Sequence, residues 1–371
     1  MIDRRCLRYF DWISFLFMVA LLGVGLLFVF SATYRPGQPV SLFFKKQLFG
    51  VVSGLIFYII ASIKDWRNFY RGGAIGYFVL LVLLAYTAVS GVLGMGATRW
   101  FSLGFFKFQP SEIAKFLFPV FVASYFYESK LPKYHFAEAP GFAFRDFLFP
   151  LGVLGVSFIL IRKQPDLGTA LIVLGSGLIL LWFVGLSKYF FLAGFAFSIV
   201  AAPILWKCLK SYQQDRILVL FGYGDMRKER YQTEQSKIAV GSGGVWGKGF
   251  LNGTQSKLEF LPEDHTDFIF AVICEEWGLM GALCVIMLFV GLFVRLMRGI
   301  AEVSTAFDQV IALGLFLPVL LSVCINIGMV LGVLPIVGIP LPFVTYGITH
   351  LWITLVSLGW INNIAIRRFY F

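Results

Sequence analysis

The chain has 371 residues, of which 59% are hydrophobic and 14% are charged, and its formal net charge is +11. Its mean hydropathy of +0.83 is far above that of a soluble domain, so lipid must solvate much of the folded chain. This composition excludes a water-soluble enzyme. The sequence contains no Walker or dinucleotide-binding fingerprint, and we expect no nucleic-acid partner.

Apolar runs long enough to cross a bilayer, about 20 residues each, recur along the chain. Backbone polar groups in lipid must be bonded within the chain, so these runs are expected to be helices. We therefore predict an all-α polytopic membrane protein with ten transmembrane helices, forming a single domain over residues 1–371. The predicted spans cover residues 12 to 31, 47 to 63, 74 to 93, 113 to 127, 147 to 161, 169 to 186, 189 to 206, 268 to 294, 305 to 331 and 351 to 366.

Basic residues predict the orientation of these spans. Arg4, Arg5 and Arg8 precede the first span, whose apolar run is longer than that of a signal peptide. Further basic residues lie in loops on the same side, so the positive-inside rule places both termini in the cytoplasm. Residues 207–262 then form one large extracytoplasmic loop, despite nine Lys or Arg residues, because long loops cross regardless of charge. We expect a multi-pass protein of the cytoplasmic membrane.

The outer segment between the third and fourth spans is rich in glycine and carries Arg99, Trp100 and Lys107. Two interpretations are open, a folded hairpin anchored by Trp100 or a re-entrant loop that holds basic residues at the edge of a substrate cavity. In the next span, Glu112 and Lys115 lie three residues apart on one helix face. An ion pair inside a membrane indicates a functional site, although a purely structural role in holding the helices together is an alternative.

Two further outer segments are candidates for substrate contact. After the fifth span, Lys163 and Asp166 lie in a charged turn that can cap two helices or bind a phosphate. Gln235 and Ser236 precede a glycine-rich stretch, residues 241–249, which is either a flexible turn or a backbone cradle for a bound group.

Carboxylates mark the start of the eighth span. Thr266 is a candidate N-cap and Asp267 lies in the predicted first turn, where it either complements the helix dipole or acts chemically. Glu275 and Glu276 follow two turns later and must find partners inside the bundle. The histidines form no metal-ligand spacing with the cysteines, so no structural zinc site is predicted.

Four stretches resemble the shape, elongation, division and sporulation family, in the same order and with the same ten-span layout. Within that family, the wording from Gly253 to Gly278 is closer to the members that act in cell elongation than to those that act in division. One departure is visible in the last outer turn, where the family usually reads SYGGSS and this chain reads TYGITH, ending in His350. The stretches are GMGATRWFSLGFFKFQPSEIAK, KQPDLGTA, QSKIAVGSGGVWGKGFLNGTQSKLEFLPEDHTDFIFAVICEEWG and NIGMVLGVLPIVGIPLPFVTYG.

The resemblance implies a peptidoglycan glycosyltransferase that polymerises lipid II at the outer membrane face and works with a class B penicillin-binding protein in the cell-elongation complex. By that resemblance Asp267 is the essential carboxylate, and Arg99, Trp100, Glu112 and Lys115 fall in the other matched motif. We therefore expect Asp267 to be catalytic and these four residues, with Lys163, Gln235 and Ser236, to bind substrate.

Glycosyl transfer from a lipid pyrophosphate needs a base for the acceptor hydroxyl and positive charge for the leaving group. Asp267 is the candidate base, or instead a ligand of a divalent cation, Mg²⁺ or Mn²⁺. A lipid flippase, with Glu112, Lys115, Glu275 and Glu276 as its important charges, is an alternative. A scaffold of the cell-wall synthesis complex is a third.

Overall fold

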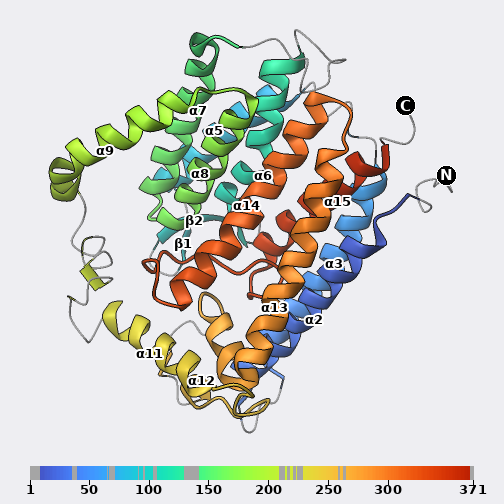
Figure 1. The fold of residues 1–371 in the computed structure, drawn as a ribbon, viewed down its shortest axis with the longest axis vertical. Helices are drawn as coiled ribbons and strands as arrows, with labels where there is room; N and C mark the ends of the chain where they lie inside the picture. The colour runs from blue at the N-terminus through green and yellow to red at the C-terminus, as the bar shows by residue number, and fades with distance from the viewer. Residues whose placement is uncertain are drawn as a thin grey trace.

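The computed structural model describes residues 9–35, 40–64, 66, 72–90, 92–94, 97–102, 107–128, 142–208, 214, 218–219, 223, 229–257, 260–261 and 265–367. A helix occupies each of the ten predicted spans (Figure 1). These helices are α2 (Trp12–Thr33), α3 (Leu42–Ile63), α5 (Gly73–Ser90), α6 (Pro110–Ala123), α7 (Phe144–Lys163), α8 (Leu167–Val184), α9 (Lys188–Cys208), α13 (Ile269–Ala301), α14 (Ala306–Val330) and α15 (Ile348–Arg367).

Six of these helices, namely α2, α3, α7, α8, α13 and α14, are long and apolar enough to cross a membrane, and α5 and α9 contain shorter apolar stretches. The polytopic helical membrane fold is thus confirmed. The helices α6 and α15 belong to neither group, so the number of ten spans stays a prediction. The extent of the domain, residues 1–371, and of the outer loop, residues 207–262, also stay predictions.

Polar side chains start several of these apolar helices by accepting otherwise unpaired backbone amides. Asp11 accepts the amide of Ser14 at the start of α2, and Ser41 accepts that of Phe44 at the start of α3, at 3.3 and 3.1 Å. Pro110 opens α6, where its missing N–H costs no helix hydrogen bond. After α6, a short π-helix, η1 (Ser124–Glu128), continues the chain.

The first helices pair with the last ones. In Figure 1, α2 and α3 run beside α13 and α15, and α14 crosses between this group and a second group that contains α5, α6, α7 and α8. Small residues allow the closest of these approaches, since a Cβ added at Gly359 of α15 would lie 2.5 Å from the carbonyl oxygen of Tyr58 in α3. Helix α9 lies at the edge of the bundle, with most of its side chains exposed.

A small antiparallel sheet follows α5, where the sequence analysis predicted either a hairpin or a re-entrant loop. Its strands are β1 (Val92–Gly94), β2 (Ala97–Ser102) and β3 (Lys107–Phe108), in the order β1-β2-β3. The segment therefore folds as paired strands, which add to the all-α prediction, and the anchoring role of Trp100 stays a prediction. The register shifts within β1, because Val92 pairs with Trp100 and Leu93 pairs with Thr98.

The two ends of the bundle differ. Helix α2 begins and α15 ends at the same end, where the amide of Asp11 donates to Asn362 Oδ1 at 3.3 Å. The sheet, α11 (Glu229–Ser242) and α12 (Thr254–Lys257) lie at the other end (Figure 1). This second end also holds the start of α13 and the turn between α14 and α15, and it carries the candidate site.

Candidate active site at the loop-bearing end of the bundle

Asp267 lies in the turn just before α13 and is half-buried. Asn326 of α14 fixes its backbone, because the Asn326 side-chain amide donates to the carbonyl oxygens of Asp267 and Ile339 at 2.9 and 2.7 Å. A Cβ added at Gly338 would lie 3.4 Å from Asp267 Oδ2, so the turn between α14 and α15 packs against the carboxylate. The helix starts later than predicted, with Phe268 as its N-cap, so the prediction that Thr266 is the N-cap is wrong.

The turn between α14 and α15, residues 331–347, is the predicted outer turn and is held from several sides. Gln47 of α3 is fully buried and clamps this turn, donating to the carbonyl of Thr345 and accepting the amide of Gly347, both at 3.2 Å. The amide of Tyr346 donates to the carbonyl of His265 at 3.1 Å. The turn is therefore a fixed wall beside the segment that carries Asp267.

The predicted ion pair of α6 is present and has a third member. Lys115 Nζ lies 2.8 and 2.7 Å from the two carboxylate oxygens of Glu112, and both side chains are buried. His350, in the first turn of α15, places Nδ1 3.0 Å from Glu112 Oε2. The sequence marked His350 only as a departure from the family motif, because its partner is 238 positions away.

The start of α8 packs against the turn between α14 and α15. Asp166 is the N-cap of α8, accepting the amide of Thr169 at 3.2 Å, and Gln109 Nε2 donates to its other oxygen at 2.7 Å. A Cβ added at Gly168 would lie 2.5 Å from the carbonyl of Val337, so α8 packs tightly against the outer turn. The structure supports the capping interpretation of Asp166. Lys163 is exposed in the last turn of α7.

The glycine-rich stretch is docked on α13 and is not an open cradle. The amides of Lys248 and Gly249 donate to the carbonyls of Glu275 and Glu276 at 3.0 and 2.9 Å. α13 is kinked at this point, where Gly278 has φ 65° and ψ −161° and its neighbour Leu279 donates its amide to the carbonyl of Gly244. A positive φ of this kind favours glycine, and a Cβ at Gly278 would also lie 2.3 Å from the amide nitrogen of Gly247.

Glu275 secures the far side of this docked loop. Its fully buried Oε1 accepts from Lys248 Nζ at 2.6 Å and from both the amide and the hydroxyl of Thr254 at 2.8 and 2.9 Å. Glu276 accepts a hydrogen bond from Ser31 of α2. Both glutamates thus find partners, as predicted. Their contacts join α13 to α2, to the glycine-rich stretch and to the start of α12.

The remaining predicted substrate residues lie in pairs on two elements, α11 and β2. Ser236 is fully buried in α11 and donates to the carbonyl of Val330 at the end of α14 at 2.8 Å, while Gln235 beside it is half-buried. Trp100 is half-buried on β2, and Arg99 is the extra residue at the shift in the β1–β2 register. The roles of these four residues stay predictions.

Comparison with known proteins places this arrangement in a family. The model of the FtsW, RodA and SpoVE family, described as cell cycle proteins, matches residues 12–369. The chain belongs to this family. The match covers the paired α6 residues, the docked glycine-rich stretch and Asp267, which confirms the resemblance seen in the sequence.

Individual members of the family resemble the chain over nearly its whole length. The peptidoglycan glycosyltransferase MrdB of Escherichia coli K12 is 38% identical over 97% of this chain and 94% of that protein. MrdB of Helicobacter pylori 26695 is 33% identical over 100% of this chain and 93% of that protein. The stage V sporulation protein E of Bacillus subtilis 168 is 31% identical over 96% of both chains.

Solved structures of family members share the fold. A chain from a peptidoglycan synthase complex, in which polymerization and crosslinking are coordinated, has a TM-score of 0.80 and 26% identity over 97% of this chain and 98% of that chain. The rod shape determining protein RodA of Thermus thermophilus has a TM-score of 0.70 at 24% identity, over the same shares of the two chains.

Proposed function

We propose that the chain is a peptidoglycan glycosyltransferase, which polymerises lipid II into glycan strands at the outer face of the cytoplasmic membrane during cell elongation. The observation that carries this proposal is the placement of Asp267. Its carboxylate lies at the loop-bearing end of α13, on a backbone held by Asn326 and against the turn at Gly338. Relatives at 33–38% identity over nearly the whole chain are named for this activity.

Asp267 is proposed as the general base. In glycosyl transfer the acceptor hydroxyl loses its proton to a carboxylate as its oxygen bonds to the donor anomeric carbon, and the lipid pyrophosphate departs. A base must be within hydrogen-bond reach of that hydroxyl, and a fixed backbone preserves this geometry. The hydrogen bond from Asn326 and the packing of Gly338 supply that fixation.

The leaving pyrophosphate needs positive charge that is already in place. We assign this role to Lys115, whose ammonium is held by Glu112 at the edge of the cavity between α14 and α15. Lys163 is exposed at the same end of the bundle and is a second candidate. Arg99 and Trp100 on β2, and Gln235 and Ser236 on α11, complete the proposed substrate contacts.

In the alternative role for Asp267, its carboxylate would hold a divalent cation, Mg²⁺ or Mn²⁺, instead of acting as the base. The described residues hold no cluster of three or more His, Cys, Asp or Glu side chains that could bind a metal by themselves. Mg²⁺ is commonly held by one or two carboxylates together with substrate phosphates, and Asp267 offers such a carboxylate. When bound, the cation would neutralise charge on the pyrophosphate.

A class B penicillin-binding protein is the proposed partner, because the chain with a TM-score of 0.80 comes from a complex that coordinates polymerization with crosslinking. We propose that both termini lie in the cytoplasm, which places α11, α12 and Asp267 outside. Membrane lipids surround the bundle, and lipid II enters from the outer leaflet.

The test is polymerisation of lipid II by the purified chain with its partner in detergent. Asp267→Asn is expected to lower the rate by at least about 100-fold, the contribution of a general base. Asp308→Asn is the matched control, since Asp308 lies in the first turn of α14 at the opposite end of the bundle, where it accepts a hydrogen bond from the hydroxyl of the N-cap Thr305. Normal glycan strands from a folded Asp267→Asn variant would refute the assignment, and a wild-type chain that makes no polymer but moves lipid across vesicles would indicate a flippase.

A further inference from the structure

His350 of α15 contacts the ion pair that Glu112 and Lys115 form in α6. Its Nδ1 lies 3.0 Å from Glu112 Oε2, the oxygen that also lies 2.7 Å from Lys115 Nζ. An ionised carboxylate only accepts hydrogen bonds, so Nδ1 carries the proton and donates it. Glu112 therefore receives two donors, one cationic from its own helix and one from α15.

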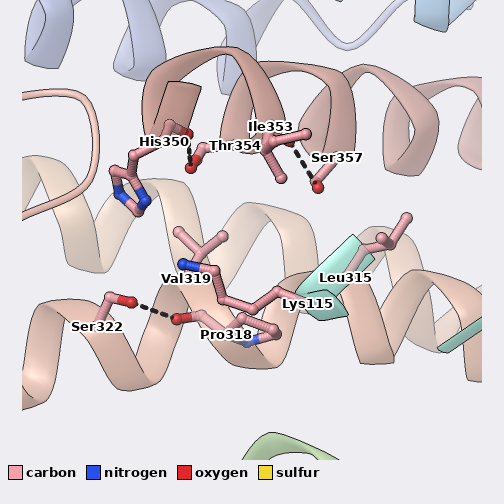
Figure 2. Close-up of a pocket in the computed structure, with 9 residues that line it drawn as sticks. All are labelled: Lys115, Leu315, Pro318, Val319, Ser322, His350, Ile353, Thr354 and Ser357. Atoms are coloured by element: carbon pink, nitrogen blue, oxygen red, sulfur yellow. Dashed lines mark hydrogen bonds between the residues drawn. The ribbon is translucent and has the colours of Figure 1, made fainter. Parts of the chain in front are cut away.

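The other ring nitrogen of His350 faces a small cavity. Nε2 is buried and has no hydrogen-bond partner within the described part of the chain. Figure 2 shows the ring and the Lys115 side chain on the same cavity between α14 and α15, which Ser322 and Thr354 also line. The two hydroxyls donate to carbonyl oxygens of their own helices, at 2.8 Å each. The contact with Glu112 is thus the only hydrogen bond that the structure gives to the ring among the described residues.

The contact joins two walls of the candidate site. His350 is in the first turn of α15, directly after the outer turn that packs on Asp267. Glu112 is in the first turn of α6, directly after Gln109, which is bonded to the α8 cap Asp166. Glu112 is buried and so is Lys115, with exposed fractions of 4% and 7%, so solvent does little to screen this arrangement.

We propose that His350 is a positioning residue, which acts through its Nδ1–H to orient the carboxylate of Glu112 and thereby fixes the ammonium of Lys115 for the pyrophosphate. The inference rests on the proposed function. A charge that is fixed before the reaction stabilises the departing group without reorganisation, whereas a carboxylate held by one partner alone can rotate and carry the ammonium with it.

Two amide substitutions at His350 distinguish the role of Nδ1 from that of Nε2. His350→Asn places an amide donor near the position of Nδ1, whereas His350→Gln places one near Nε2. His350→Ala removes both. Each variant is purified with the partner, and kcat and KM for lipid II are measured beside the thermal unfolding midpoint. Because a hydrogen bond to a charged group is lost, His350→Ala and His350→Gln are expected to lower kcat by about 10- to 100-fold with KM within about twofold of wild type. His350→Asn is expected to stay within about threefold of wild type.

A double-mutant cycle provides the second readout. In a Glu112→Ala background, His350→Ala is expected to add no further loss of kcat, because the acceptor through which it acts is already gone. Rescue by Gln but not by Asn would overturn the proposal in favour of Nε2, and wild-type kcat in all three His350 variants would also overturn it. If the wild-type chain itself makes no polymer, the proposed function fails. The coupling of the two substitutions in thermal unfolding then still shows whether the contact exists.

Discussion

Gly243 is the position at which the docking of the glycine-rich stretch can be tested most directly. A Cβ at Gly243 would lie 1.9 Å from the carbonyl oxygen of Cys274 in α13, far inside the 3.0 Å that real Cβ contacts respect. Gly243→Ala must therefore push the loop away from α13 by about 1 Å or more. The obstacle is helix backbone, so it cannot give way as the end of a flexible side chain would.

The expected loss in the free energy of unfolding of Gly243→Ala follows from the contacts that this movement breaks. The hydrogen bonds from Lys248 and Gly249 to the carbonyls of Glu275 and Glu276 are 3.0 and 2.9 Å long, and a shift of about 1 Å takes both beyond hydrogen-bond length. At about 1 kcal/mol each, with an added cost for disturbing the buried carboxylate of Glu275, the loss is about 3–5 kcal/mol. For a chain of this size we expect the unfolding midpoint to fall by roughly 4–6 °C.

The assay is thermal unfolding of the purified protein in detergent, followed by intrinsic fluorescence. Gly241→Ala is the matched control, because it lies two residues earlier in the last turn of α11 and a Cβ there meets nothing within 4 Å. Alanine in place of an exposed helical glycine is expected to leave the midpoint unchanged or to raise it slightly. A midpoint for Gly243→Ala within about 2 °C of wild type would refute the docking described above.

Three further perturbations test other parts of the site. Glu275→Gln leaves Lys248 without its ion-pair partner, so we expect a loss of about 2–4 kcal/mol in the same assay, and an unchanged midpoint would contradict a structural role for the carboxylate. Asn326→Leu removes the donor shared by the carbonyls of Asp267 and Ile339, and is expected to slow polymerisation by about 10-fold, measured as glycan formed from lipid II. Removal of divalent cations with EDTA is expected to stop polymerisation and added Mg²⁺ or Mn²⁺ to restore it; an unaffected rate would exclude a cation bridge.

Short-range features of this chain were predictable from its sequence. Apolar runs predicted where these ten helices lie, because the bilayer demands long helices with no unpaired backbone groups. The pair of Glu112 and Lys115 followed from a spacing of three residues on one helix face. The glycine-rich punctuation before α6 predicted a hairpin only as one of two interpretations.

Contacts between distant segments were not predictable in the same way. The glycines near Gly243 predict only a turn. The structure shows that they let the chain pack closely against the backbone of Cys274 and Glu275 in α13. Gln47 carries no local signal of its role, since its two partners are about 300 positions away on the outer turn. The start of α13 was placed early for a related reason, because a threonine before an apolar run satisfies the local rule for an N-cap although the chain forms a turn there.

The pairing of α3 with α15 has a consequence for synthesis of the chain. At 5–20 residues per second, ribosomes need on the order of 15–60 s after α3 is made before α15 emerges. During that time the side chains of Gln47, Tyr58 and Ser62, which are buried in the finished protein, lack α15 and the turn before it. During synthesis, α3 therefore lies in the membrane with these polar side chains lacking their partners. A chain truncated before α15 leaves the same side chains permanently accessible to lipid or to quality-control proteases.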